Sequence, residues 1–169
     1  MSRLPNFLVV GAHKSGTTSL YEYLRQHPDV FLSDRKEGLF FSELHATAGP
    51  LHEQKNAEVL HTFEDYAALF EPAGDEPAVG DVSPDYLYCY ETSIANIRRH
   101  LSEPPRIIAI LRNPVERAYS NYTFYRKHNM ESLSFEEALD REAERRAAGW
   151  WWAFRYAEIG LYHDQVQAY

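Results

Sequence analysis

The segment that most constrains the fold is FLVVGAHKSGTTSL, residues 7–20. The near-continuous apolar run from Asn6 to Gly11 is typical of a buried strand. Apolar residues then recur at helical spacing from about Thr17 to His27, and Pro28 ends that pattern. A strand that enters a helix through a short glycine-bearing loop gathers free backbone N–H groups at the positive end of the helix dipole. The segment therefore predicts a strand, loop and helix that bind an anion.

The side chains of this loop favour a phosphate group as the anion. Lys14 adds a full positive charge, and it precedes Gly16, whereas the Walker pattern places the lysine after its second glycine. The loop is therefore a phosphate loop of another kind. A plain glycine turn with a capping threonine is the alternative, but the strand context, the lysine and four hydroxyl groups favour phosphate binding. The hydroxyl groups belong to Ser15, Thr17, Thr18 and Ser19.

The rest of the chain alternates short strands with helices. Strands are predicted at 30–32, 79–82 and 106–111, and helices after Thr62, at 92–101, from Asn113 to about Asn129, from Ser134 to about Gly149, and at 156–169. Residues 47–56 give no clear signal. This alternation predicts an α/β fold in which a central, mainly parallel sheet carries helices on both faces, and a length of 169 residues predicts a single domain over 1–169.

Composition excludes several classes of protein. No apolar run approaches the roughly 20 residues of a membrane span, and MSRLPNFLVV is typical of a first core strand, not of a signal peptide. The single cysteine, Cys89, excludes a disulfide framework and a Cys-rich zinc site. The net charge of −8 argues against nucleic acid as a partner. We expect a cytoplasmic protein, and a bacterial one.

A basic stretch nevertheless runs from Arg98 to Lys127, with seven Lys or Arg residues and two acids, a local charge of +5. Within it, Arg112 directly follows the strand predicted at 106–111, which is expected to be buried, and Ser120 lies on the next helix. Ligands of open parallel sheets bind at the carboxyl ends of the strands, where both Lys14 and Arg112 are expected. A solvated helix face is the simpler interpretation for Arg126 and Lys127.

Two motifs in this order resemble a known family, the sulfotransferases that use 3'-phosphoadenosine 5'-phosphosulfate (PAPS). FLVVGAHKSGTTSL resembles their 5'-phosphosulfate loop, and LRNPVERAYSNY, residues 111–122, resembles their 3'-phosphate motif. The resemblance extends from about Asn6 to Tyr169. It implies the P-loop sulfotransferase fold, PAPS as sulfuryl donor with PAP (3',5'-ADP) as product, and no metal. Family domains normally continue with further helices, a strand and a closing loop, so we expect this sequence to be the N-terminal two thirds of the domain.

The resemblance also implies roles for single residues. Lys14 is expected to neutralise the leaving phosphate oxygen, the 5'-phosphate group to bind at residues 14–19, and Arg112 and Ser120 to hold the 3'-phosphate. Glu37, in DRKEGLFF, stands at the position of the family's Lys-Glu-x-x-Phe-Phe glutamate and is expected to be the catalytic base. His13 is a weaker candidate for the base, because it lies inside the phosphate loop.

Residues that contact the acceptor are expected near Glu37 and in GDVSPDYLY, residues 80–88. A turn with a buried tyrosine explains the second segment equally well. Family members that modify glycosaminoglycans tend to have a lysine where this sequence has Val82. This difference argues against a polyanionic sugar as the acceptor. The acceptor is expected to be a small molecule or a carbohydrate, and the aromatic residues at 150–156 are expected mainly in the core. The predicted acceptor contacts are Lys36, Phe40, Asp81, Ser83 and Tyr86.

Two other functions stay open at this point. A small-molecule kinase with a phosphate loop would need lysine after the glycine and an acid at a strand end for magnesium, and the strand before Arg112 ends in no such acid. The second alternative is a nucleotide-binding module without catalytic activity. It is considered because the last third of the domain is expected to be absent from this sequence.

Overall fold

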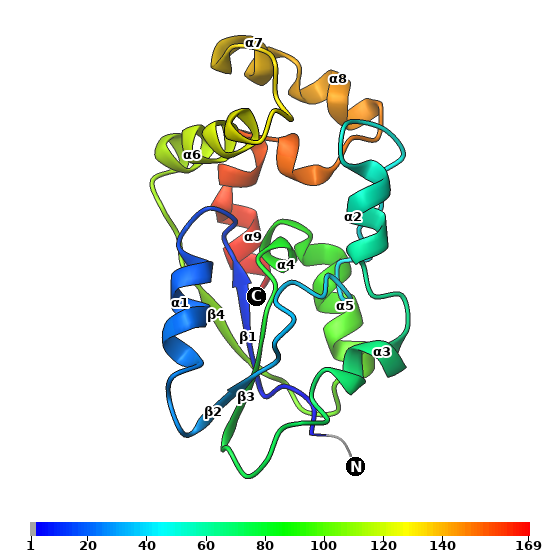
Figure 1. Cartoon of the computed structure of the whole chain (residues 1–169), viewed down its shortest axis with the longest axis vertical. Coiled ribbons are helices and arrows are strands. Elements are labelled where there is room, and N and C mark those ends of the chain that lie inside the picture. The colour runs from blue at the N-terminus through cyan, green and yellow to red at the C-terminus, as the bar shows by residue number, and fades with distance from the viewer. Residues whose placement is uncertain (1–2) are drawn as a thin grey trace.

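The computed structural model describes residues 3–169 and contains a four-stranded parallel sheet (Figure 1). Its strands are β1 (Phe7–Gly11), β2 (Val30–Leu32), β3 (Ala78–Val82) and β4 (Arg106–Ala109), in the order β2-β3-β1-β4. In the register of the sheet, Phe7 of β1 pairs with Gly80 of β3 on one side and with Arg106 of β4 on the other. The parallel sheet brings the carboxyl ends of all four strands to one edge, so the predicted α/β fold is confirmed.

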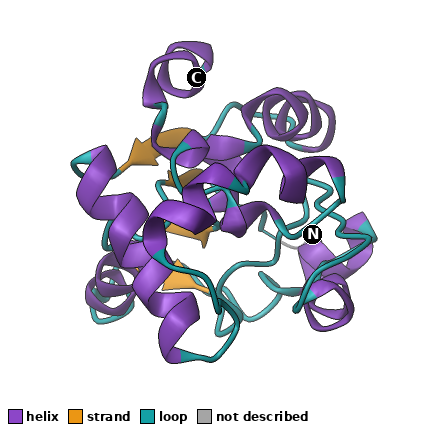
Figure 2. Ribbon diagram, turned by 90° about the horizontal axis from the view of Figure 1, so that it is seen from above, coloured by secondary structure: helices purple, strands orange, loops and turns teal. Residues whose placement is uncertain are grey.

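Helices cover both faces of the sheet (Figure 2). They bury the side chains of β1, which alternate between two hydrophobic clusters. Leu8 and Val10 pack on one face with residues of α3 (Phe63–Ala68), α4 (Asp85–Tyr88) and α5 (Tyr90–His100). Phe7 and Val9 pack on the other face with Tyr21 of α1 (Thr17–Leu24). The central strand is therefore buried on both faces, as parallel sheets require.

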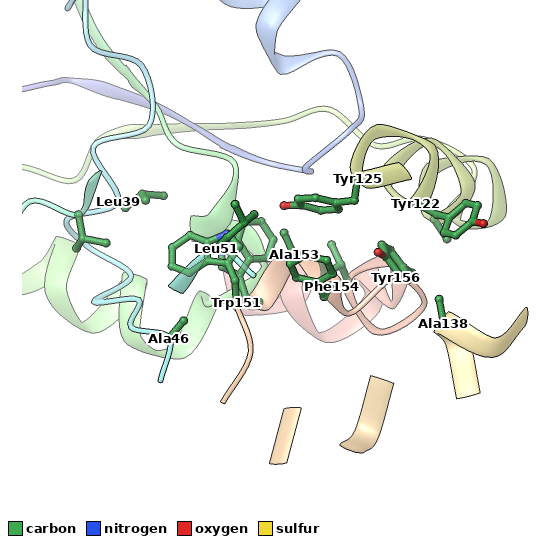
Figure 3. Packing of buried hydrophobic residues seen from close by; sticks show 14 residues of the cluster. Leu39, Ala46, Leu51, Tyr122, Tyr125, Ala138, Trp151, Ala153, Phe154 and Tyr156 are labelled. Atoms are coloured by element: carbon green, nitrogen blue, oxygen red, sulfur yellow. The ribbon is translucent and has the colours of Figure 1, made fainter. Parts of the chain in front are cut away.

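A third hydrophobic cluster lies beyond the carboxyl ends of the strands, under α6, α7 and α8 (Figure 1). Tyr125 projects from α6 and stacks on Phe154 with ring centroids 4.4 Å apart (Figure 3). Trp151, Trp152, Phe154 and Tyr156 are buried here, so their expected place in the core is confirmed. The elements of this region are α2 (His52–Glu58), α6 (Pro114–Lys127), α7 (Phe135–Asp140), α8 (Glu142–Ala147), the 3-10 turns Trp152–Phe154 and Glu158–Gly160, and α9 (Tyr162–Ala168).

The helix starts that the sequence predicts are confirmed by their caps. Thr62 accepts a hydrogen bond from the backbone of Asp65, and Asn113 accepts from the backbone of Val115 and Glu116. Ser134 forms the predicted reciprocal capping box with Glu137. These local signals fix where α3, α6 and α7 begin.

Two predicted helices are wrong in their extent. The helix expected from Ser134 to about Gly149 breaks at Arg141, because α8 turns two charged side chains inward. Glu142 accepts hydrogen bonds from the backbone of Ala157 and Glu158, and Arg145 forms a bidentate pair with buried Glu131 at 2.6 and 2.9 Å. The helix expected over 156–169 divides into the turn at Glu158–Gly160 and α9, and α2 was not predicted.

The strand before Arg112 was expected to be buried, and this is also wrong. All four residues of β4 are exposed, including Ile107 and Ile108, because β4 is an edge strand that pairs with β1 alone among the described residues. Across residues 3–169, no helix combines the length and apolar character needed to cross a membrane.

Asp85 gives the fold a specific dependence on pH. Its carboxyl group is buried at the start of α4, and burial raises its pKa from 3.8 to about 8, a rise that the Ser42 hydroxyl and the backbone N–H of Asp85 only partly oppose. Between these two values the folded protein keeps a proton that the unfolded chain has lost. The contribution of Asp85 to the free energy of unfolding is therefore fully present below pH 4 and is lost as the pH rises toward 8, at about 1.4 kcal/mol per pH unit.

We expect Asp85→Asn to remove this loss. Urea unfolding of both proteins from pH 5 to pH 9 should show the variant gaining stability relative to the wild type as the pH rises, with the difference levelling off above pH 8. A difference in the free energy of unfolding that does not change with pH would show that Asp85 is ionised in the folded protein.

Candidate active site

The phosphate loop runs from the end of β1 to the start of α1, and two glycines determine its path. Gly16 caps α1 with a φ of +98°, a left-handed conformation that glycine adopts without strain. A Cβ atom on Gly11 would lie 2.6 Å from Cβ of Leu87, so the strand end packs directly on α4. The free N–H groups of the first turn of α1 thus lie at the carboxyl edge of the sheet.

A cavity of about 880 Å³ opens beside this loop. The phosphate loop forms one wall with Lys14, Thr17 and Thr18, and residues 35–37 lie next to it. One side of α6 contributes Ser120, Phe124 and Tyr125. The cavity thus brings together Lys14, Glu37 and Ser120, which the sequence places in three separate segments. Its remaining lining residues are His13, Gly16, Leu39, Leu51, Gln54, Lys55, Ala57, Glu58, His128, Met130, Trp151, Trp152 and Ala153.

Lys14 is half-buried in this cavity and faces an aromatic ring. Its Nζ lies 4.1 Å from the ring centroid of Phe124. Burial lowers the pKa of Lys14, the negative charge of Glu37 opposes that change, and the charges of Lys36 and Arg112 add to it. No carboxylate of the described chain lies within ion-pairing distance of this ammonium group. Lys14 is therefore a cation without a counter-ion at the start of α1.

Glu37 is held by its own backbone and by its neighbour. Its N–H donates to the carbonyl of Val82 at 3.2 Å, and its φ of +63° is a left-handed conformation. Lys36 donates a hydrogen bond to Oε1 of Glu37. The carboxylate therefore lies in the same cavity as Lys14 but is paired with a different lysine.

His13 packs edge-on against Trp152, with ring centroids 5.1 Å apart. Burial and then the positive charge of Lys14 hold the pKa of His13 well below its usual value, with smaller contributions from other cations. The imidazole is therefore neutral at pH 7, and a base with so low a pKa removes protons weakly.

Comparison with known proteins identifies the family. Residues 4–169 match the sulfotransferase domain. A crystal structure of a sulfotransferase from Alicyclobacillus acidocaldarius superposes with a TM-score of 0.93 at 37% identity and covers 99% of this chain and 68% of that chain. The chain belongs to the sulfotransferase family.

Curated relatives of this sulfotransferase include membrane-associated sulfotransferase kil1 of Dictyostelium discoideum, 31% identical over 83% of this chain and 28% of the relative. Mouse carbohydrate sulfotransferase 15 is 27% identical over 80% of this chain and 30% of its own. Bovine bifunctional heparan sulfate N-deacetylase/N-sulfotransferase 2 is 33% identical over 75% of this chain and 13% of its own. The chain therefore spans less than a third of the length of these curated relatives.

Three residues expected to hold the donor do not line the cavity of this sulfotransferase. Arg112 is exposed and pairs with Glu116 one helical turn later, at 3.2 Å. The hydroxyl oxygen of Ser15 is buried without a partner among the described residues, and Ser19 is exposed on α1. Gly16, Thr17, Thr18 and Ser120 do line the cavity. Arg112 must leave Glu116 to meet a ligand, which its exposed, flexible side chain permits.

Most of the predicted acceptor contacts lie outside the cavity as well. Asp81 is buried and accepts hydrogen bonds from the hydroxyl groups of Ser83 at 2.9 Å, Tyr86 at 3.0 Å and Tyr66 at 3.1 Å. Burial raises the pKa of Asp81, and the three hydroxyl donors oppose that rise. Phe40 stacks on Tyr66 in the same cluster, with centroids 5.0 Å apart. Of the five predicted contacts, the cavity includes Lys36 alone, and the geometry of the other four favours a structural role.

One wall of the cavity, formed by α2 and the residue before it, was not predicted from the sequence. Leu51, Gln54, Lys55 and Glu58 come from α2 and the residue before it. Their spacing of three and four residues fits one face of a helix, but only Leu51 is apolar, so no hydrophobic periodicity predicts this helix from the sequence. Trp151 and Trp152 were expected in the core, where they are, and they also line the cavity. Within residues 3–169 no cluster of His, Cys, Asp or Glu is arranged to hold a metal ion.

We expect Asp81→Ala to lower the free energy of unfolding by about 2–4 kcal/mol, because three buried hydroxyl groups lose their acceptor. Urea unfolding measures this, and Ser83→Ala, which removes one donor, is the milder control. Binding of PAP to the folded fraction should not change. A stable Asp81→Ala protein with altered ligand binding would instead place Asp81 in the binding site.

Proposed function

We propose that this sulfotransferase transfers a sulfuryl group from PAPS to a hydroxyl group of its acceptor. The observation that carries the proposal is the convergence of Lys14, Glu37 and Ser120 on one cavity at the N-terminus of α1. PAPS supplies the activated sulfuryl group. The residues present fit this anionic donor, because Lys14, whose ammonium has no carboxylate partner in the described chain, and the first residues of α1 line the same cavity.

Lys14 and the first turn of α1 form the site for the 5'-phosphate. Sulfuryl transfer resembles phosphoryl transfer, in which charge builds up on peripheral and leaving oxygens and positive charge at those oxygens lowers the barrier. The Lys14 ammonium neutralises the leaving phosphate oxygen as the S–O bond breaks. Thr17 and Thr18 lie at the same wall of the cavity and donate hydrogen bonds to the phosphate.

Glu37 acts as the base. It takes the proton from the acceptor hydroxyl while the acceptor oxygen attacks sulfur, and PAP leaves with the bridging oxygen. Lys36, which now donates a hydrogen bond to Glu37, must release the carboxylate for this step. Ser120 on α6 and Arg112, once free of Glu116, hold the 3'-phosphate.

The acceptor binds against the wall of the cavity that Leu51, Trp151 and Trp152 form. Leu51, Trp151 and Trp152 give this wall an apolar and aromatic surface that suits the face of a sugar ring or of an aromatic compound. The names of the carbohydrate and heparan sulfate sulfotransferases support a carbohydrate acceptor. An amine is the second possible acceptor group, as in the N-sulfotransferase relative.

Thermal unfolding with PAP and with 5'-ADP at equal concentrations tests the donor site. PAP should raise the melting temperature more than 5'-ADP does, because a ligand bound only to the folded state stabilises it by mass action. Ser120→Ala should abolish that difference, whereas Thr123→Ala, on the same helix but outside the cavity, should retain it. Equal shifts with both nucleotides would contradict a 3'-phosphate site and would favour the kinase alternative.

Turnover by Glu37→Gln tests the base. The variant should lose at least about a hundredfold in kcat with PAPS and a hydroxyl acceptor, because general base catalysis contributes about that much. Its affinity for PAP should stay within about threefold of the wild type. A large loss of PAP affinity with unchanged kcat would show that Glu37 is a binding residue, and PAP binding without any transfer by the wild type would favour a nucleotide-binding module.

A further inference from the structure

The contact between Lys14 and Phe124 has no role in the mechanism above. An ammonium group 4.1 Å from a ring centroid is within the range of a cation–π interaction. Phe124 comes from α6, more than 100 residues further along the chain than Lys14, and its side chain is 39% exposed. Because Phe124 is exposed, burial of apolar surface does not explain why its ring lies against Lys14.

A competing partner for Lys14 is present in the same cavity. Glu37 lines the same cavity as Lys14, and its negative charge favours the protonated form of Lys14. A direct ion pair between the two would neutralise both groups that the reaction needs. In this structure Glu37 pairs with Lys36 instead, and Lys14 lies on the ring. The ring holds a positive charge without neutralising it, so the ammonium stays free to meet an anion.

The position of Phe124 is itself fixed by its neighbours. Its ring packs against His128 at 4.4 Å between centroids and edge-on against Tyr125 at 5.4 Å. Nδ1 of His128 lies 2.8 Å from the backbone carbonyl of Phe124, which joins the two residues a second time. Ser120 lies one helical turn earlier on the same wall of the cavity. A single helix thus carries both a residue for the 3'-phosphate and the ring that places Lys14.

We propose that Phe124 is a positioning residue that holds the Lys14 ammonium apart from Glu37 and available to the anionic donor. This inference rests on the proposed function in naming the donor. The contact itself can be tested without any ligand.

The first arm of the test is NMR of the Lys14 side chain in the ligand-free protein. The ring current of Phe124 should shift the Hε protons of Lys14 upfield, with Lys14→Ala used to assign the signal. Phe124→Leu should abolish the shift and Phe124→Tyr should retain it. Tyr119→Leu is the matched control, because Tyr119 is another exposed aromatic residue of α6 that packs on Phe135, outside the cavity. A wild-type signal without the shift overturns the proposal.

The second arm measures PAP affinity by calorimetry. Phe124→Leu should weaken binding about three- to tenfold, the range expected for loss of a partly buried cation–π contact, and Phe124→Tyr should restore it. Adding Glu37→Gln should recover more affinity in the Phe124→Leu protein than it adds to the wild type, since it removes the competing carboxylate. A role limited to packing gives no such coupling, and equal effects of Glu37→Gln in both proteins therefore overturn the proposal.

The two arms separate this inference from the proposed function. If the wild type fails to bind PAP, the donor assignment fails, and with it the part of the proposal that names the donor. The NMR arm then still decides whether Phe124 holds Lys14. If PAP binds as expected while the Lys14 shift is absent or insensitive to Phe124→Leu, the proposed function stands and this inference fails.

Discussion

The contact between the end of β1 and α4 fixes the geometry of the site. Gly11 approaches Leu87 so closely that a Cβ atom has no space, and the chain therefore leaves the sheet edge directly into the phosphate loop. The alternation of β1 between two hydrophobic clusters fixes the rotation of the strand, since Leu8 and Val10 cannot exchange faces with Phe7 and Val9. The first turn of α1 consequently presents its N–H groups at a defined point of the cavity.

The arrangement of charge in the cavity follows from this rigid frame. Lys14, Lys36 and Glu37 lie in one cavity, and two cations beside one carboxylate leave one of them without a counter-ion. Lys36, which is next to Glu37 in the chain, forms the ion pair with its carboxylate. The ammonium group of Lys14 lies over the ring of Phe124. Burial, and after it the charges of Lys14 and other cations, lowers the pKa of His13 and keeps its imidazole neutral. The cavity is thus ready for an anionic ligand without an internal ion pair that the ligand must first break at Lys14.

The sequence predicts those parts of the structure that depend on neighbouring residues. The loop at 11–16, the helix caps at Thr62 and Ser134 and the parallel sheet are local or periodic signals, and they are confirmed. The break at Arg141 was not predictable, because it depends on Glu131 and Tyr156, which lie beyond both ends of that helical segment. The exposure of β4 was missed for a related reason, since an apolar strand has the same pattern at the edge of a sheet as at its centre.

The same distinction separates the donor side of the site from the acceptor side. Lys14, Gly16 and Thr17 belong to one short motif, so their sequence spacing already places them around an anion. The acceptor wall combines Leu39, Leu51 and Trp152, which lie in three segments with no common motif. Asp81 was predicted to contact the acceptor because it belongs to the segment 80–88. Its carboxylate instead accepts hydrogen bonds from three buried hydroxyl groups and does not line the cavity. The proposed donor site is therefore encoded locally in the sequence, whereas the proposed acceptor wall depends on how distant segments pack around the phosphate loop.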